Sequence, residues 1–354
     1  MRSSLAAGLL ALLAASGSAA AETKLRVGWC ARTVTSAAAP YAIANKMGWF
    51  KAGGFAVELV PLPGSTDCVK YVGTREVLYA APSVEPLASF RPQGVLAKVF
   101  YTAYQGNIYG FAVPAESPIK SVSEIKGKTI GVQSMASAGL PVARALAADL
   151  GLDPSKDVNI VVVGEGAQAA ALVRSKQVDV LSLYDTQYAL IENAGVALRR
   201  LPSPGIDKFP SNGFIALDET IKSHRAEAVA LAQGYAKGTI FAINNPEAAI
   251  RILWEVFPQT KATGKDEATA LKDDINTLEA RAANWRLEKS GVKRWGENVM
   301  ANYQAYLDLL LKQGVLKEPI KAEDIVTNDL IDDVNKFDAA AIAEEARSYK
   351  HASH

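Results

Sequence analysis

The residues best suited to bind a ligand lie in a short loop of small and polar residues, 134–139. Ser134 and Ser137 offer hydroxyl groups, and Ala136 and Ala138 offer backbone N–H groups that no bulky side chain shields. A helix is expected to open near Leu140, and the unpaired N–H groups of a first helical turn favour a negative or hydrogen-bond-accepting group. The loop is therefore a candidate binding loop, although helix capping is an equally good explanation for both serines.

Polar residues at comparable places along the chain extend this candidate site. Asp185 is suited to a cationic or amino group, Glu165 is a possible second acidic contact, and Tyr184 precedes Asp185. For Asp185 an N-cap role fits as well, and turn or capping roles stay open for the others. The remaining candidates follow predicted strands or lie where the chain is expected to cross between domains: Thr35, Ser36, Ser65, Thr66, Ser83, Asn107 and Asn212.

The ligand's charge stays open at this stage. Helix N-termini favour an anion such as a sulfonate or carboxylate, whereas Asp185 and Glu165 favour an amine or a nitrogen heterocycle. Arg32 is the only arginine in the predicted binding loops, and an arginine clamp would favour anions. Aromatic side chains could stack on a flat ligand, but a core role fits them better: Trp29, Trp285 and Trp295.

The sequence argues against the common catalytic and cofactor sites. None of the three histidines, His224, His351 and His354, follows a predicted strand, so a serine hydrolase would lack its base. Two scattered cysteines do not make a zinc site, and no glycine-rich nucleotide fingerprint precedes a helix. We expect no catalytic residue, no metal and no cofactor. Cys30 and Cys68 follow neighbouring strands, and either a disulfide or two free thiols is compatible with the sequence.

The N-terminal residues predict export. Arg2, an apolar stretch over residues 5–15 and the small residues Ala19 and Ala21 form a signal peptide over residues 1–21. We therefore expect a periplasmic protein. The net charge of +1 falls to zero without Arg2, which argues against nucleic acid as a partner.

Two repeats of one plan are expected to position the candidate residues. Strands are predicted to start at residues 25, 55 and 77, and again at 129, 158 and 178, with helices between them. These spacings are typical of βαβ units, and in open α/β sheets ligands bind beyond the carboxyl ends of the strands. The predicted fold class is α/β, with two doubly wound lobes facing one cleft.

Two crossings between the lobes, near residues 107–114 and 210–214, predict a hinge that closes over a ligand. Residues 22–110 would form the first part of lobe 1, and residues 111–211 lobe 2. Residues 212–354 would return to lobe 1 and add C-terminal helices. Helices are expected over residues 223–243, 266–287, 295–312 and 333–348, where apolar residues recur at three-to-four spacing.

Three stretches resemble one protein family. Residues 40–58, PYAIANKMGWFKAGGFAVE, resemble the opening of substrate-binding proteins from sulfonate, nitrate and thiamine-precursor importers, the NMT1/THI5-like and SsuA-like group. Residues 123–132, SEIKGKTIGV, and 325–330, IVTNDL, resemble later motifs of that group. The chain departs from it at Gly73-Thr74-Arg75-Glu76, where an aspartate is usual, and it lacks the cysteine cluster of the related synthesis enzymes.

The resemblance implies a type II periplasmic binding protein. Such a protein would be a monomer that captures a small organic solute and passes it to the permease and ATPase of an ABC importer. The solute would be a sulfonate, a carboxylate or a pyrimidine-like heterocycle. A dehydratase-like periplasmic enzyme on the same fold and a sensor subunit are the alternatives.

Overall fold

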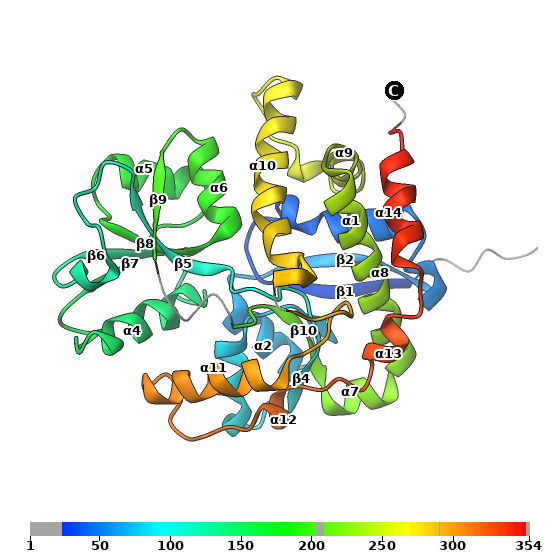
Figure 1. Ribbon diagram of the computed structural model, residues 1–354, viewed down its shortest axis with the longest axis horizontal. Helices are drawn as coiled ribbons and strands as arrows, with labels where there is room; N and C mark the ends of the chain where they lie inside the picture. The colour runs from blue at the N-terminus through cyan, green and yellow to red at the C-terminus, as the bar shows by residue number, and fades with distance from the viewer. Residues whose placement is uncertain (1–22, 203–208, 290, 352–354) are drawn as a thin grey trace, which may run out of the picture.

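The computed structural model describes residues 23–202, 209–289 and 291–351 and shows two α/β lobes side by side (Figure 1). Each lobe is built on a five-stranded mixed sheet, with the order β2-β1-β3-β10-β4 in the first and β7-β6-β8-β5-β9 in the second. The predicted fold class, two doubly wound lobes with a helical C-terminal region, is confirmed. The expected signal peptide lies outside the described residues.

The first sheet combines three parallel strands with an antiparallel pair. β1 (Thr23–Trp29) lies between β2 (Phe55–Pro61) and β3 (Tyr79–Ala80), and both neighbours run parallel to it. β10 (Gly213–Leu217) then pairs antiparallel with β3 and with β4 (Ala97–Thr102). The parallel strands follow the predicted βαβ plan. The antiparallel pair was not predicted, because its partners are more than a hundred residues apart in the sequence.

The second sheet has the same construction. β6 (Thr129–Val132) pairs in parallel with β7 (Asn159–Val162) and β8 (Val180–Tyr184). β5 (Tyr109–Pro114) runs antiparallel to β8 and to β9 (Leu198–Leu201), neither β5 nor β9 having been predicted.

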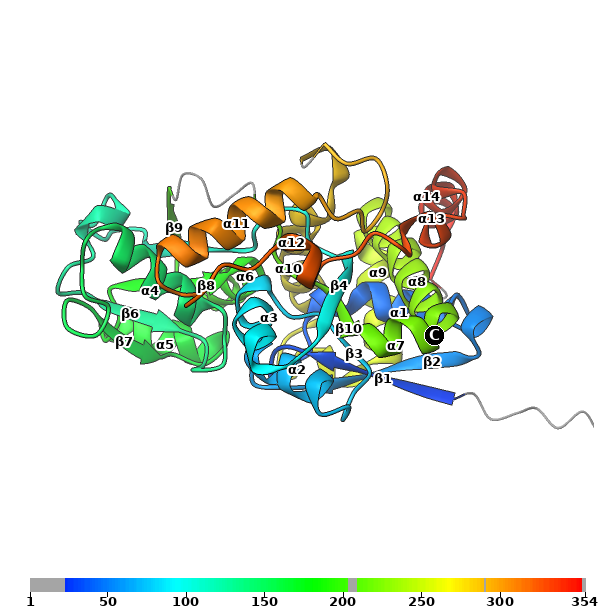
Figure 2. The ribbon, with the colours of Figure 1, turned by 90° about the horizontal axis from the view of Figure 1, so that it is seen from below.

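The two chain crossings between the sheets are hydrogen-bonded to each other. The backbone N–H groups of Ala103 and Tyr104 both donate to the carbonyl of Asn212, at 3.0 Å each, and Ser211 N donates to the carbonyl of Tyr104 at 3.1 Å. The first crossing links β4 to β5, and the second leads from β9 back to β10 (Figure 2). The predicted hinge therefore consists of two chain segments that are hydrogen-bonded to each other.

Helices cover the faces of both sheets. In the first lobe these are α1 (Ala39–Lys46), α2 (Ser65–Gly73) and α3 (Val84–Phe90). In the second they are α4 (Gly139–Asp149), α5 (Ala167–Arg174) and α6 (Asp185–Asn193). α2 starts at Ser65, so the polar residues after β2 form its first turn and not a separate loop.

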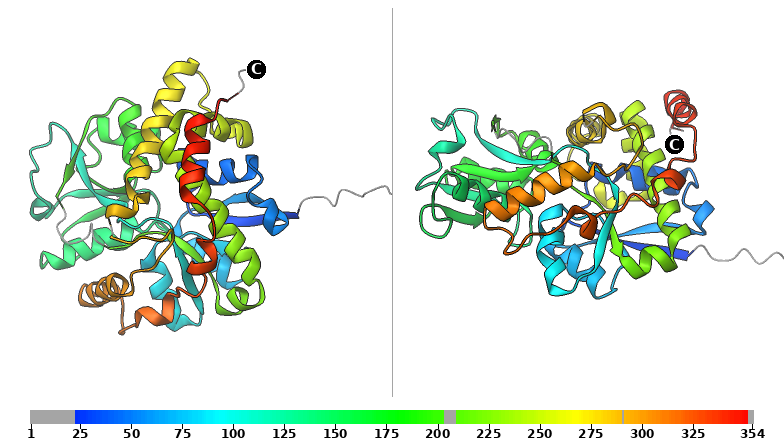
Figure 3. Two further views of the ribbon diagram at one scale, coloured as in Figure 1. Left: turned by 45° about the vertical axis from the view of Figure 1, so that its right-hand side comes forward. Right: turned by 60° about the horizontal axis from the view of Figure 1, so that its bottom comes forward.

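The C-terminal part returns to the first lobe. α14 runs beside α8 in the views of Figure 3. Among the described helices, none is both long and apolar enough to cross a membrane. The helices of this part are α7 (Asp218–Ser223), α8 (Arg225–Asn244), α9 (Pro246–Val256), α10 (Glu267–Trp285), α11 (Met300–Lys312), α12 (Ala322–Ile325), α13 (Ile331–Val334) and α14 (Ala339–Ser348).

α11 starts five residues later than predicted, because the backbone of Trp295 is held outside a helix. Asn335 accepts the N–H of Trp295 at 2.8 Å and donates its amide to the carbonyl of Trp295 at 2.9 Å. These side-chain bonds replace the helical hydrogen bonds of that residue.

Close packing of α8 on α1 depends on a glycine. A Cβ atom at Gly238 would lie 2.2 Å from the carbonyl oxygen of Pro40, a backbone atom that cannot turn aside. Tyr235, on the same helix, contacts Tyr41 with ring centroids 4.9 Å apart. In the core of the first lobe, α8 therefore packs directly against α1, with the backbone of the two helices in close contact at Gly238.

Replacing Gly238 by alanine tests this packing. Glycine to alanine inside a helix normally stabilises a protein by up to about 1 kcal/mol. Here we expect the opposite sign, a loss of about 1–3 kcal/mol from overpacking against α1. Urea denaturation of both proteins measures it, and a stabilised G238A variant would contradict the contact.

Candidate functional site

A cavity lies between the lobes, beyond the carboxyl end of β1 and beside the hinge. Residues of both lobes line it, from Trp29 and Thr35 of the first to Tyr184 and Thr186 of the second, with Asn212 of the hinge. About 40 Å³ is open to the centres of water molecules, which is room for roughly three waters at 10–15 Å³ each. In this state the cavity suits a small group or a single ring.

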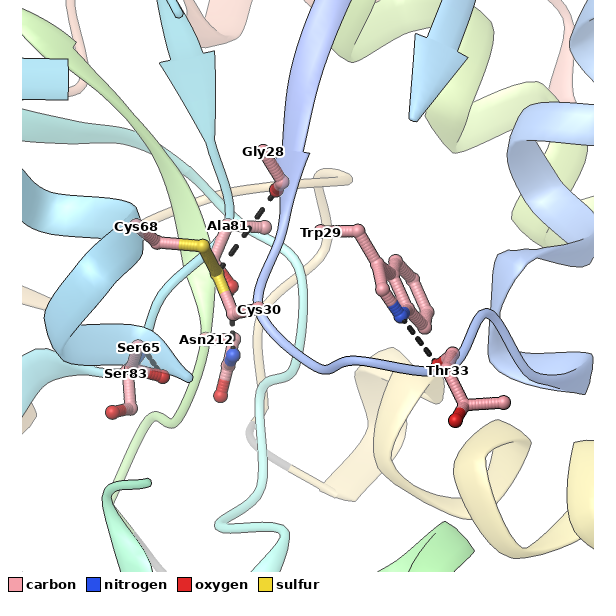
Figure 4. Close-up of a disulfide and its surroundings, with 9 residues drawn as sticks. All are labelled: Gly28, Trp29, Cys30, Thr33, Ser65, Cys68, Ala81, Ser83 and Asn212. Atoms are coloured by element: carbon pink, nitrogen blue, oxygen red, sulfur yellow. Dashed lines mark hydrogen bonds between the residues drawn. A yellow bond between two sulfur atoms is a disulfide. The ribbon is translucent and has the colours of Figure 1, made fainter. Parts of the chain in front are cut away.

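Five of the fifteen residues that line the cavity are aromatic: Trp29, Tyr41, Tyr104, Tyr109 and Tyr184. The indole N–H of Trp29 donates to the carbonyl of Thr33 at 2.8 Å, which fixes the ring (Figure 4). Tyr109 and Tyr184 meet edge to face, with centroids 5.7 Å apart. Burial raises the pKa of Tyr41 and of Tyr184 well above its ordinary value, so these phenols stay neutral.

Arg281 is the one cation that lines the described cavity, and it is already neutralised. Its Nε donates to both oxygens of Asp185, at 3.1 and 2.9 Å, and its Nη2 donates at 2.7 Å. Asn284 donates to the same carboxylate at 2.9 Å. Burial opposes the charge of Arg281, but Asp185 outweighs it and raises the pKa of the guanidinium above its usual value. The pair adds no net charge to the cavity.

The Arg281–Asp185 pair also joins the lobes, because Arg281 belongs to α10 and Asp185 to α6. The guanidinium lies over the ring of Tyr104, 4.1 Å from its centroid, and both side chains of the pair are almost fully buried. Asp185 was predicted to contact a cationic ligand. In the structure the cation that it contacts is Arg281 of the protein itself.

A disulfide closes the loop at one side of the cavity. Cys30, which lines the cavity, is bonded to Cys68 of α2 (Figure 4). The sequence left this pairing open. The bond holds the end of β1 against α2 and so restrains the loop that carries Thr33 and Thr35.

Direct contacts between loops hold the two lobes together at the rim of the cavity. The Glu165 carboxylate accepts the backbone N–H groups of Arg32 at 3.1 Å and Thr33 at 3.2 Å. It also accepts the side-chain amide of Gln133 of its own lobe. Because these bonds link a loop after β7 to the loop after β1, they stabilise the arrangement of the two lobes that the structure shows.

The loop 134–139 makes further interlobe contacts. Ser134 Oγ donates to the carbonyl of Pro63 at 2.8 Å, and Thr66 N donates to the carbonyl of Ala136 at 3.1 Å. A Cβ at Gly64 would lie 2.5 Å from the Ala136 oxygen, so glycine is needed for this approach. The loop predicted from the sequence to bind the ligand thus contacts the opposite lobe.

Of the predicted site residues, Thr35, Tyr184 and Asn212 line the cavity. Asn212 is oriented by its amide, which donates to the carbonyl of Ala81 at 2.7 Å. Glu165, Asp185, Ser134, Thr66 and Ala136 join the lobes as described above.

The other predicted residues have local roles. Ser36 Oγ donates to Asp274 at 3.0 Å. Ser137 Oγ accepts the N–H of Gly139, the first residue of α4, at 3.2 Å. Ala138 is buried at the start of α4. Ser65, Ser83 and Asn107 lie in a polar group that does not line the cavity.

Sequence reasoning missed Tyr41, Tyr104, Tyr109 and Arg281. Tyr41 and Arg281 lie on helices, where their spacing is that of ordinary packing residues. Tyr104 and Tyr109 flank the first crossing, and a tyrosine on each side of a predicted hinge was the signal available. Arg32, the arginine singled out from the sequence, is exposed and contacts Glu165 through its backbone.

Comparison with known proteins gives the family. Residues 35–249 match the family model described as NMT1/THI5 like. The chain belongs to the NMT1/THI5-like family. The riboflavin-binding protein RibY of Chloroflexus aurantiacus is 21% identical over 297 residues, which cover 83% of this chain and 82% of RibY.

Solved structures share the fold. The alkanesulfonate-binding protein SsuA from Xanthomonas axonopodis pv. citri, bound to MOPS, matches with a TM-score of 0.64 and 18% identity, over 87% of this chain and 99% of SsuA. The desulfurization enzyme DSZB matches with a TM-score of 0.54 and 15% identity, over 88% and 98% of the two chains. This fold thus occurs in binding proteins and in an enzyme.

Glu165→Gln tests the rim contact. Glutamine offers one acceptor for two N–H groups and brings no charge, so we expect the closed state to be less populated. The radius of gyration from small-angle X-ray scattering should rise, while the melting temperature changes little. Glu192→Gln, an exposed substitution on α6 that bonds only within its own lobe, is the control. An unchanged scattering profile for E165Q would contradict this role.

Arg281→Leu tests the buried pair. Removing one partner leaves a buried charge unpaired, and we expect a loss of about 3–5 kcal/mol in the free energy of unfolding. The double variant Asp185→Leu, Arg281→Leu should recover a large part of that loss, because no charge is then stranded. Guanidinium denaturation of the single and double variants measures the coupling. Additive losses would show that the two side chains do not act as a pair.

Proposed function

We propose that this protein captures a small aromatic or heterocyclic solute in the periplasm and delivers it to an ABC importer. The observation that carries the proposal is the cavity between the lobes, walled by five aromatic rings and free of net charge. Aromatic walls gain from contact with a flat apolar ring. The threonine and asparagine side chains at Thr35, Thr186 and Asn212 supply the few polar contacts that orient a ligand.

The neutrality of the cavity argues against an oxyanion as the solute. A sulfonate or carboxylate needs a cation or several free donors, and the guanidinium of Arg281 is committed to Asp185. Of the solute classes considered from the sequence, the heterocycle fits best. The small free volume favours a single ring over a flavin, although RibY is described as a riboflavin-binding protein.

Location and partners rest on the family and the N-terminal sequence. The signal peptide predicted over residues 1–21 supports export, as does the likeness in fold to solved structures described as periplasmic binding proteins for sulphonate and nitrate. Two lobes that close around a solute through a paired hinge are suited to presenting that solute to a permease. We expect a monomer that serves the permease and ATPase of one import system.

Binding without turnover is the proposed mode of action, with a dehydratase-like enzyme as the alternative because DSZB shares the fold. No histidine lines the cavity that the structure describes. Cys30 is oxidised, because it forms a disulfide with Cys68. Opening of the hinge admits the solute, and closure excludes water and brings Thr35 and Tyr184 to its two sides. Mass spectrometry should recover a bound solute unchanged.

A thermal-shift screen tests the proposal. Nicotinamide, 4-aminopyrimidine, benzoate, methanesulfonate, nitrate and riboflavin are added separately to the purified mature protein. We expect the neutral single-ring compounds to raise the melting temperature in proportion to the logarithm of their concentration. The anions and riboflavin should leave it unchanged, because the cavity offers neither a free cation nor room for three fused rings.

Two tryptophan variants give this screen its control. Trp29→Leu removes a cavity wall and should abolish the shift. Trp49→Leu removes a tryptophan that packs on Phe241, away from the cavity, and should retain it. A shift with methanesulfonate or nitrate alone would overturn the proposed solute class, and a product peak in the mass spectrum would favour the enzyme.

A further inference from the structure

The guanidinium of Arg281 uses only one of its edges to bind Asp185. Nε donates to both carboxylate oxygens, at 3.1 and 2.9 Å, and Nη2 donates to Oδ1 at 2.7 Å. A guanidinium carries five N–H groups in a fixed planar fork, so this pairing occupies Nε and one N–H of Nη2. The remaining N–H groups donate to no residue that the structure describes. We call Nη1 and the second N–H of Nη2 the outer edge of Arg281.

The outer edge is the part of the guanidinium that can reach the cavity. Arg281 lines the cavity, whereas Asp185 does not. The carboxylate borders a different hollow, together with Asn284, so the edge that meets it points away from the cavity. The side chain of Arg281 is only 4% exposed, but its Nη1 is not sealed inside the protein as Nη1 of Arg91 is. An unpartnered donor on a buried side chain is therefore open to a ligand.

Several contacts hold the outer edge in a fixed position. The guanidinium carbon of Arg281 lies 4.1 Å from the ring centroid of Tyr104. Asp185 is fixed in turn, because Asn284 donates to its carboxylate at 2.9 Å and its own N–H donates to the carbonyl of Ile108 at 3.0 Å. Donors that are already ordered bind a ligand at a lower entropic cost.

The geometry of the outer edge selects two acceptors that lie side by side. One N–H of Nη1 and the free N–H of Nη2 point in the same direction, as they do when an arginine binds a carboxylate or the O6 and N7 atoms of guanine. A carboxylate or sulfonate would place a second anion beside Asp185, and Arg281 is the one cation that lines the described cavity. Burial of the excess negative charge would oppose its binding. Two neutral acceptors avoid that penalty.

We propose that the outer edge of Arg281 is the specificity-determining contact of the cavity, and that it binds a neutral heterocycle in which a ring nitrogen lies beside a carbonyl oxygen. Nη1 donates to one of these acceptors and Nη2 to the other, while the ring lies among the aromatic side chains. Pyrimidin-2-ones, the ring type of cytosine, have this arrangement. The inference deepens the proposed function and rests on it, since the ring must occupy the cavity.

Matched probes that differ at one ring position test the inference. The first pair is 1-methylpyrimidin-2-one and 1-methylpyridin-2-one, which share their shape and carbonyl, but a C–H group replaces the acceptor nitrogen in the pyridone. The second pair is 1-methylcytosine and 1-methyluracil, in which the corresponding nitrogen accepts in the first and carries a hydrogen in the second. Isothermal titration at neutral pH with millimolar probe measures the four dissociation constants.

We expect the wild-type protein to bind the pyrimidinone about tenfold or more tightly than the pyridone, because a hydrogen bond from a charged group is lost. The preference for 1-methylcytosine over 1-methyluracil should be at least as large, because two N–H groups would face each other in the uracil complex.

Two variants separate recognition from structure. Arg281→Lys keeps a cation for Asp185 but has a single nitrogen, so we expect both preferences to fall to within about twofold. Asn193→Ala is the matched control. Asn193 on α6 donates to the carbonyl of Asp273 at 2.8 Å and to Thr277 Oγ1 at 3.2 Å, both on α10, and none of the three lines the cavity. This variant weakens the same pair of helices and should keep both preferences. A purely structural role of Arg281 would lower the melting temperature without changing the ratios.

The outcomes distinguish the two proposals. Equal binding of the pyrimidinone and the pyridone by the wild type would overturn the role of the outer edge and leave the aromatic cavity standing, and this comparison decides the question even where R281K does not fold. Undiminished preferences in R281K would also overturn it, as would tighter binding of benzoate, whose carboxylate fits the same edge. Binding of none of the four probes would overturn the inference, and the proposed function fails with it only if nicotinamide and 4-aminopyrimidine also do not bind.

Discussion

The buried pair of Asp185 and Arg281 is the interaction on which the rest of the site depends. It joins α6 of the second lobe to α10 of the first, and three charge-assisted hydrogen bonds fix its geometry. Because the two charges neutralise each other, the pair links the lobes beside the cavity without requiring a charged group on the solute. It also holds the guanidinium over Tyr104, which sets one aromatic wall. Lobe closure and the neutrality of the cavity therefore have a common cause.

The sequence predicted the fold well because the fold depends on local patterns. Strands of β-branched residues separated by helices at βαβ spacing identify parallel sheets wherever they occur. The antiparallel strands β4, β5, β9 and β10 escaped prediction, because their pairing is decided by which distant segment they meet. Thr35 and Tyr184, two of the residues singled out from the sequence, line the cavity for the same local reason, since Thr35 lies in the loop after β1 and Tyr184 is the last residue of β8.

The rest of the site was not predictable from strand ends. Two lobes that face each other bring their loops together, and a polar loop at such an edge can bind either a solute or the opposite loop. Glu165 and Ser134 bind loops of the opposite lobe. No local sequence pattern distinguishes the two cases. Arg281 was missed for a related reason. It lies within a long helix, and its significance comes only from the position of Asp185, ninety-six residues earlier.

Contacts between the lobes that do not involve a solute determine how tightly a solute can bind. An apparent dissociation constant equals the intrinsic one divided by the fraction of protein in the binding-competent state. Closure held by Glu165, Ser134 and the buried pair raises that fraction, but it also slows entry, because the cavity must open to admit a ring. The neutral solute proposed above would supply no long-range attraction to assist entry. The proposed function therefore suits a site with two kinds of interlobe contact. The hydrogen bonds of Glu165 and Ser134 at the rim of the cavity are weak enough to break when a solute enters. The buried pair of Asp185 and Arg281 is strong enough to keep the lobes aligned meanwhile.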